Sequence, residues 1–358
     1  MTSQTLSTHQ RQPAFDALKL FAIFLVLWGH AIQHFLSTEP FDNPLECLIY
    51  SFHMPLFMMI SGYFAAGSLR ASAGKFLWRK FRQLLLPCLT WGLLIYILLK
   101  GGQAILVGDR SASLADMLTY LFGNLWFLKS CFLCFLLAYP VYHFGQGRLV
   151  WIVLSVAVSL LATRFQLPMM YPCFLVGIEL RRHVSWQKWL ARNYALLGVG
   201  FVIMLCFLRP EYFDHWYLVQ IGGGTIRCKL DSYVFVFAYR LVLGIVGSLF
   251  FIGFFQALFR VERSGKWVER ICAWGQLTLG IYILQNIILE TLLARVLKFD
   301  SLSLPLFNYV VAPLICLVVL LVCIGLIRLI SRWDILAFLF LGKALPSAQR
   351  EAGSAGSM

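Results

Sequence analysis

The sequence carries too little charge for a water-soluble protein. Only 13% of its 358 residues are Asp, Glu, Lys or Arg, whereas about a quarter of the residues are charged in an ordinary soluble domain. Because so few charges cannot cover a surface that faces water, lipid must cover most of the exterior. The low charge content therefore excludes a soluble globular protein and predicts an integral membrane protein.

Acidic residues are the scarcer charged class, with 16 Asp and Glu against 30 Lys and Arg and a formal net charge of +14. In a soluble protein this excess would favour nucleic-acid binding. Here the basic residues lie in short segments between apolar runs, where the positive-inside rule for membrane proteins accounts for them. We therefore expect no nucleic-acid partner.

The sequence also lacks the residue spacings of a disulfide framework or a metal centre. Cys131 and Cys134 form a CxxC, but they lie in an apolar stretch with no second pair, which favours buried or lipid-facing thiols. His30 and His53 are expected at a similar depth and could form a metal pair, yet no third ligand stands at a convincing spacing. We therefore predict no metal.

Long hydrophobic runs fill the rest of the chain, and 60% of all residues are hydrophobic. The runs predict an all-α, polytopic fold of about ten transmembrane helices, since each run approaches the length that crosses a bilayer. The expected helices are 15–33, 45–67, 84–99, 123–142, 149–162, 168–180, 194–208, 233–258, 271–293 and 306–330. We expect a tail at 1–13, one membrane domain at 14–343 and a flexible tail at 344–358.

The distribution of basic residues predicts the orientation of these helices. Basic clusters follow the second, sixth and eighth expected helices. If ten helices alternate in direction, all three clusters fall on the same side as both termini. Because cytoplasmic loops are enriched in Lys and Arg, both termini are predicted to be cytoplasmic.

The first expected helix contains polar residues that are unfavourable in lipid, namely Asp16, Lys19 and His30. Lys19 and His30 are eleven residues apart, which is close to three full helical turns, so both project from one face about 16 Å apart along the axis. Ionisable residues within a membrane are candidates for function. The alternative is a lysine that reaches the interface and a histidine that only packs.

Other polar residues in apolar runs allow a functional and a structural interpretation. The basic segment with Arg79, Lys80 and Arg82 indicates either a phosphate site or a signal for topology. Glu179, Arg240 and Glu290 are expected near helix ends, where they would reach toward water. The remaining candidates are His53, Ser61, Tyr63, Trp126, Lys129 and Gln285.

Taken in order along the chain, these motifs resemble the acyltransferase-3 family of membrane O-acyltransferases. The resemblance rests on Lys19 through His30, on the segment from Phe52 to Phe64, and on Arg79-x-x-Arg82 followed by Pro87. Trp126-Phe127-Leu128 and Tyr282-Ile-Leu-Gln285 resemble two later motifs. Many members have Arg in place of Lys19 and His in place of Gln285, so the resemblance does not support an acid–base role for Gln285.

The resemblance implies an enzyme of the bacterial inner membrane that moves an acetyl group from cytoplasmic acetyl-CoA to a hydroxyl of a surface or lipid-linked glycan. His30 would be the general base, assisted by Lys19 and Asp16. The CoA phosphates would bind Arg79, Lys80, Arg82 and Lys19. The substrate-positioning residues would be His53, Ser61, Tyr63, Trp126, Lys129 and Gln285.

The expected partners are membrane lipid and the glycan acceptor, and a homodimer is compatible with the sequence. The alternative function is a transporter or flippase for a lipid-linked sugar or small molecule. It needs the same polar path but no acyl donor. Transporters of this kind often have inverted repeats with broken helices, and the sequence shows no such pairing.

Overall fold

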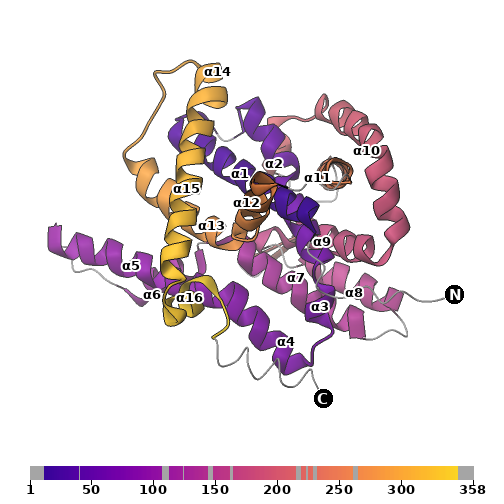
Figure 1. The fold of residues 1–358 in the computed structure, drawn as a ribbon, viewed down its shortest axis with the longest axis horizontal. Helices are drawn as coiled ribbons and strands as arrows, with labels where there is room; N and C mark the ends of the chain where they lie inside the picture. Colours follow the sequence, from indigo (N-terminus) through magenta and orange to yellow (C-terminus); the bar gives the residue numbers. More distant parts are fainter. Residues whose placement is uncertain are drawn as a thin grey trace.

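The fold is a bundle of helices with one small β-hairpin (Figure 1). We describe it from a computed structural model that covers 12–39, 41–106, 113–123, 125–143, 148–161, 164–214, 219–222, 225–228, 232–260 and 265–345. The hairpin pairs β1 (Val219–Gly222) with β2 (Thr225–Cys228) in antiparallel register. It lies between α10 (Val184–Leu205) and α11 (Ser232–Leu258) in the chain.

Two central helices, α1 (Pro13–Phe35) and α2 (Pro44–Tyr63), are the most buried of the apolar helices. Both begin with proline at the first helical turn, where the missing N–H removes no helical hydrogen bond. The Asn43 side chain caps α2 by accepting a hydrogen bond from the N–H of Leu45. In Figure 1, α15 lies on one side of this pair and α10 and α11 lie on the other.

The remaining helices surround this pair. The chain between α2 and the hairpin forms α3 (Ala66–Leu69), α4 (Ala73–Lys80), η1 (Phe81–Leu85), α5 (Leu86–Leu106), α6 (Leu114–Gly123), α7 (Trp126–His143), α8 (Arg148–Leu161), η2 (Arg164–Gln166), α9 (Leu167–Arg182), α10 and η3 (Pro210–Asp214). After α11 come α12 (Lys266–Gly275), α13 (Thr278–Gln285), η4 (Asn286–Leu292), η5 (Leu293–Arg295), α14 (Leu304–Leu306), η6 (Phe307–Val311), α15 (Ala312–Ile330) and α16 (Asp334–Leu341).

Close contact between α2 and α9 depends on two glycines. A Cβ atom at Gly62 would lie 2.0 Å from the carbonyl oxygen of Phe174, and one at Gly177 would lie 2.1 Å from that of Met59. Both distances are far below van der Waals contact, so any larger residue would force the backbones apart. Small residues at helix interfaces are the usual means of close packing in membranes.

Three segments wind as π-helices: η1, η4 and η6. Each contains a polar residue that bears on the candidate site, namely Arg82, Glu290 and Asn308 respectively. Single π-turns often occur at functional sites because they turn a side chain away from its α-helical direction. Asn308 joins three elements: its side chain pairs reciprocally with that of Asn43 at 2.9 and 3.0 Å, and its carbonyl accepts the Trp28 indole N–H.

Six helical stretches within the described residues are long and apolar enough to cross a membrane, and α12 with the segment from α13 to Arg295 forms a seventh that is bent by 59°. α8 has 14 residues and α9 has 16, which is short for a complete crossing. The protein is therefore a multi-pass membrane protein, while the expected total of about ten crossings and the cytoplasmic termini stay predictions.

The all-α prediction is confirmed for the body of the chain, and the hairpin is its exception. Nine of the ten expected spans each correspond to one helical segment with somewhat different ends, whereas the expected span 271–293 crosses the bend between α12 and α13. Eight of the nine described cysteines are buried and none of the nine forms a disulfide, as expected for buried or lipid-facing thiols. The predicted terminal tails lie almost entirely outside the described residues.

We predict that Gly177→Ala lowers stability sharply. Overpacking a tight core costs about 1–3 kcal/mol, and the new methyl would meet a backbone carbonyl that cannot rotate away. Gly200→Ala on α10 is the matched control, because a Cβ atom there meets nothing within 4 Å and both changes carry the same gain in helix propensity. Thermal unfolding in detergent should give a clearly lower midpoint for Gly177→Ala than for Gly200→Ala. Equal midpoints would contradict the close packing.

Candidate functional site

The candidate site consists of two cavities that share Met54 and Tyr282 in their walls. The cavity nearer the N-terminal end of α1, which we call the inner cavity, has a volume of about 270 Å³ and lies among α1, α2, α4, η1, α7 and α13. The other, which we call the outer cavity, has a volume of about 210 Å³ and is lined by the C-terminal half of α1, the first half of α2, and residues of α7, α9, α11 and α13. The two cavities therefore adjoin each other at the side chains of Met54 and Tyr282.

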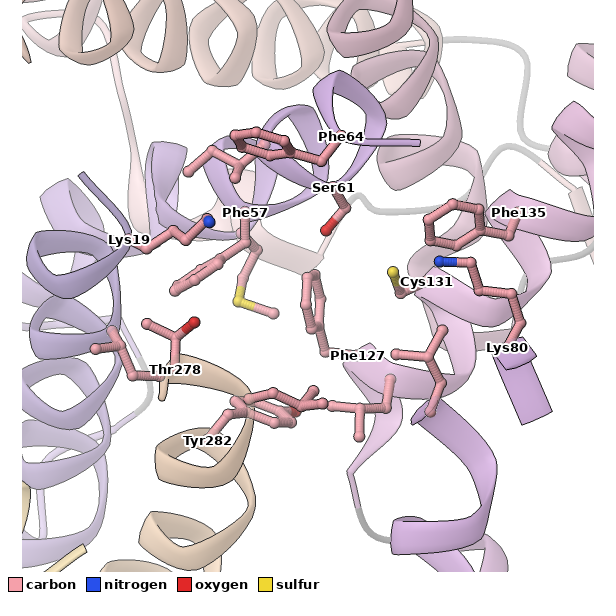
Figure 2. Close-up of a pocket in the computed structure, with 16 residues that line it drawn as sticks. Lys19, Phe57, Ser61, Phe64, Lys80, Phe127, Cys131, Phe135, Thr278 and Tyr282 are labelled. Atoms are coloured by element: carbon pink, nitrogen blue, oxygen red, sulfur yellow. The ribbon is translucent and has the colours of Figure 1, made fainter. Parts of the chain in front are cut away.

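Lys19 and Lys80 bring positive charge into the inner cavity from opposite sides (Figure 2). The Lys19 ammonium lies 3.3 Å from the Asp16 carboxylate and 4.5 Å from the ring centre of Phe64. The Lys80 side chain is buried, with its ammonium 3.5 Å from the ring centre of Phe135. The rest of the wall is mainly apolar, and the Ser61 hydroxyl points into the space (Figure 2).

Asp16 is held from two directions. It accepts the Lys19 ion pair on one oxygen and a 3.3 Å hydrogen bond from the Gln276 side chain on the other. A Cβ atom at Gly275 would lie 1.9 Å from the Asp16 carbonyl oxygen, so α12 and α1 touch backbone to backbone at this level. This contact fixes Asp16 beside Lys19.

A third cavity adjoins the inner one through Leu84 and Leu279. Arg82, from the π-helical η1, and Lys343, from the residues after α16, both line it. Arg79 lines none of these cavities, and its guanidinium donates to the carbonyl of Gly67 at 3.0 Å. The expected basic cluster is thus divided: Lys80 and Arg82 line cavities, whereas Arg79 is bound to a backbone carbonyl.

His30 lines the outer cavity and has a carboxylate beside it. Its Nε2 lies 3.5 Å from Oε1 of Glu290, and Nε2 of His34 lies 3.9 Å from the other oxygen. His30 Nδ1 is buried and has no hydrogen-bond partner in the described part of the chain. Nε2 is therefore the nitrogen of His30 that can exchange a proton with a substrate.

The expectation that Glu290 reaches toward water is wrong, because its side chain is turned inward between two histidines. Gln285 explains the arrangement, since it is fully buried and donates a hydrogen bond of 3.5 Å to Oε1 of Glu290. In an α-helix, side chains five residues apart point about 140° away from each other. The π-helical winding of η4 reduces that difference enough for the two side chains to meet, and an α-helical projection of the sequence could not show this.

The opposite wall of the outer cavity carries His53, Trp126 and Arg240. His53 is buried, and its Nδ1 lies 2.7 Å from the carbonyl oxygen of Ile49, so Nδ1 carries the proton. Arg240 donates to the carbonyls of Tyr212 and Phe213 at 3.2 and 3.1 Å. These hydrogen bonds hold Arg240 against η3, and the expectation that it reaches toward water near a helix end stays a prediction.

Besides Gln285, two further expected positioning residues lie outside both cavities. The Tyr63 hydroxyl donates to Gln187 at 3.0 Å and accepts from Arg181 at 3.2 Å, so it ties α2 to α9 and α10. Lys129 is buried with its ammonium 5.7 Å from the ring centre of Phe165. Both Tyr63 and Lys129 pack against other side chains, and neither lines the inner or the outer cavity.

Comparison with known proteins identifies the family of this chain. Residues 12–328 match the sequence profile of a family described as an acyltransferase domain, acyltransferase-3. The chain belongs to this family.

Two relatives of this acyltransferase-3 chain carry the name nodulation protein NolL. The protein from Mesorhizobium japonicum is 32% identical over 214 residues, which cover 56% of this chain and 57% of the relative. The protein from Sinorhizobium fredii is 32% identical over 219 residues, which cover 58% and 59%. The matches thus span somewhat over half the length of these relatives. No solved structure gives a significant match.

A set of contacts after η5 fixes the outer end of α1. Ser37 donates its backbone N–H and its hydroxyl to the two oxygens of Asp300 at 2.7 and 2.9 Å. The N–H of Phe299 donates to the carbonyl of Phe35 at 3.0 Å, and the Lys298 ammonium donates to that of His34 at 2.9 Å. These contacts set the height of α1 relative to η4, and therefore of His30 relative to Glu290.

The Asp300 contact predicts a pH-dependent contribution to stability. Hydrogen bonds from the Ser37 backbone and hydroxyl lower the pKa of Asp300. A carboxyl whose pKa is lowered on folding stabilises the fold above its unfolded value of about 3.9, and this stabilisation is lost as the pH falls through the lower, folded pKa. The difference in unfolding midpoint between wild type and Asp300→Asn should be constant near neutral pH and shrink below about pH 4. In a Ser37→Ala background the pH dependence of that difference should be smaller but not abolished, because the backbone N–H of residue 37 still donates to Asp300. An unchanged dependence would contradict the contribution of the hydroxyl.

Proposed function

We propose that this protein is a membrane O-acetyltransferase that moves an acetyl group from acetyl-CoA to a hydroxyl of a glycan, with His30 as general base. The single observation that carries the proposal is the pair of adjoining cavities. One contains the imidazole–carboxylate pair of His30 and Glu290, and the other contains Lys19 and Lys80 in a mainly apolar wall. Family membership supports acyl transfer, and the cavities suggest how two substrates reach one another.

The inner cavity suits the pantetheine arm of the donor, which is apolar along much of its length. The CoA phosphates would bind Lys80, Lys19 and Arg82, with Lys343 as a further contact in the adjoining cavity. An extended arm is on the order of 15–20 Å, close to the rise of about 16 Å from Lys19 to His30 along α1. The thioester could then lie near Tyr282 while the nucleotide stays at the mouth formed by η1 and α16.

Proton transfer would use Nε2 of His30, the ring nitrogen that lies beside Glu290. Imidazole is suited to this task because its ordinary pKa lies near neutral pH. As the acceptor oxygen bonds to the thioester carbonyl, its proton would pass to Nε2, and CoA would leave as the thiol after reprotonation. Glu290 would stabilise the imidazolium, and Gln285 would hold Glu290 in place. A transient acyl-histidine is the other route that this arrangement allows.

The outer cavity suits a sugar more than a hydrocarbon chain. Its wall combines the aromatic rings of Trp126 and Tyr50 with the polar groups of Gln33, Gln166 and Arg240. Sugars present hydroxyl groups around apolar ring faces, and sites of this mixed character recognise both. We propose a surface or lipid-linked glycan as the acceptor and the bacterial inner membrane as the location, with the inner cavity facing the cytoplasm.

The decisive experiment uses acetyl-CoA labelled in the acetyl group. Purified protein in lipid vesicles is incubated with the label and a glycolipid extract from the native membrane, and both CoA release and label in the glycan are measured. A transporter or flippase would give neither signal. Absence of both signals with wild type, alongside binding of a labelled lipid-linked sugar, would overturn the acetyltransferase proposal in favour of transport.

His30→Ala should lower the rate of acetyl transfer by about 10²–10⁴-fold, the usual contribution of a general base. Glu290→Gln should lower kcat by about tenfold, equivalent to about 1.4 kcal/mol of lost imidazolium stabilisation. His143→Gln, on a histidine outside both cavities, is the control and should transfer acetyl at the wild-type rate. Matching thermal midpoints would show that the variants fold. A wild-type rate in His30→Ala would exclude His30 as the base.

Donor binding should depend on Lys80 and Arg82 more than on Arg79. We expect Lys80→Met and Arg82→Gln each to raise the Kd for acetyl-CoA by about tenfold, or 1.4 kcal/mol. Arg79→Gln should have a smaller effect, because its guanidinium is engaged with the Gly67 carbonyl. Arg260→Gln, a basic residue that lines none of the three cavities, serves as the control for net charge. The affinity for acetyl-CoA is measured by calorimetry. Equal affinities in all four variants would mean that the basic cluster sets the membrane topology and does not bind the donor.

A further inference from the structure

The cluster of His30, His34 and Glu290 has the composition of a transition-metal site. One ligand atom from each residue can be chosen so that all three lie within 4.8 Å of one another. Two imidazoles and one carboxylate form a ligand set that binds Zn²⁺, which accepts nitrogen at about 2.0–2.1 Å and carboxylate oxygen at about 2.0–2.2 Å. Ligand atoms around one tetrahedral ion lie about 3.3 Å apart at those bond lengths.

The observed distances are close to that requirement. One carboxylate oxygen lies 3.5 Å from Nε2 of His30 and the other lies 3.9 Å from Nε2 of His34. All three ligand atoms lie within 4.8 Å of one another, so side-chain rotations that close the set by up to about 1.5 Å would let them meet one ion. His30 and His34 are four residues apart on one face of α1, with ring centres 5.8 Å apart and planes 16° apart. Two histidines at this spacing on a helix are a known zinc-binding arrangement. Glu290 supplies the third ligand from a different segment, η4.

The surroundings support an ion and also limit its affinity. Gln285 donates to Glu290, as the residues behind a metal ligand commonly do. The side chains of His30, His34 and Glu290 are 18%, 32% and 23% exposed, so a dissolved ion can reach them. The Lys298 ammonium is bound to the His34 carbonyl nearby, and its positive charge opposes a cation. Three ligands beside one positive charge favour reversible binding over a permanently bound ion.

We propose that His30, His34 and Glu290 bind a divalent transition-metal ion such as Zn²⁺, and that the bound ion blocks acetyl transfer. The ion would form a coordination bond with the lone pair of His30 Nε2, which is the pair that accepts the proton from the acceptor hydroxyl. No oxidation or reduction is involved, and removing the ion restores the free base. The blocking step rests on the proposed function of His30, whereas the binding step rests on geometry alone.

Binding is tested first, without reference to activity. The full chain, purified in detergent without a polyhistidine tag and stripped with EDTA, is titrated with ZnCl₂ in a calorimeter. We expect one ion per chain for wild type and a Kd at least tenfold higher for His34→Gln and Glu290→Gln. His143→Gln controls for histidines elsewhere and should bind as wild type does, whereas Mg²⁺ should not bind because it prefers an all-oxygen shell. Absence of zinc binding in wild type, or unchanged binding in His34→Gln, would overturn the site.

Inhibition is tested by acetyl transfer from labelled acetyl-CoA at increasing Zn²⁺. Wild type should lose more than nine-tenths of its rate at about ten times the measured Kd, in line with simple occupancy. His34→Gln should resist the ion: whatever its zinc-free rate, Zn²⁺ at ten times the wild-type Kd should leave most of that rate, because one of the three ligands is missing. A wild-type rate that Zn²⁺ leaves unchanged, or that EDTA lowers, would overturn the blocking step. Zinc binding without any acetyl transfer in the absence of the ion would instead refute the proposed function and leave the metal site standing.

Discussion

The placement of one carboxylate, that of Glu290, is the constraint on which the rest of the site depends. A carboxylate removed from water is unfavourable unless it has a partner, and within a membrane protein few partners are at hand. Here the partners are the imidazoles of His30 and His34 and the amide of Gln285. The π-turn of η4 brings Gln285 and Glu290 together, and the contacts from Lys298 to Asp300 hold α1 at the matching height. The π-helical winding of η4 and the contacts of residues 298–300 therefore both determine how Nε2 of His30 lies relative to Oε1 of Glu290.

The two cavities follow from the way the central helices pack. Gly62 and Gly177 let α2 and α9 touch, and Gly275 lets α12 touch α1 beside Asp16. Where side chains are large again, around Phe57, Phe127 and Tyr282, the helices stand apart and space is left between them. The helices are thus in backbone contact at the glycines and farther apart at the aromatic residues. Lys19 and His30 lie beside the resulting cavities.

Sequence reasoning succeeded where the signal was local or periodic. Low charge content and long apolar runs identified a helical membrane protein, and an eleven-residue spacing placed Lys19 and His30 on one face of α1. The motifs of the first 90 residues also indicated the family correctly. These inferences need only the geometry of a regular helix. The structure then shows that Lys19 lines the inner cavity and His30 lines the outer one.

Reasoning from the sequence was less informative where a side chain's direction depends on irregular winding or on a distant segment. Glu290 belongs to a π-turn, and its partners lie some 260 residues earlier in the chain, so neither hydropathy nor helical periodicity could pair them. Arg79 and Arg82 are three residues apart, yet only Arg82 lies within a π-turn and lines a cavity. Tyr63 ends α2 beside Arg181 and Gln187, which no local pattern predicts. In each case a residue of the expected type was present, and the departure from a regular helix decided which atoms it meets.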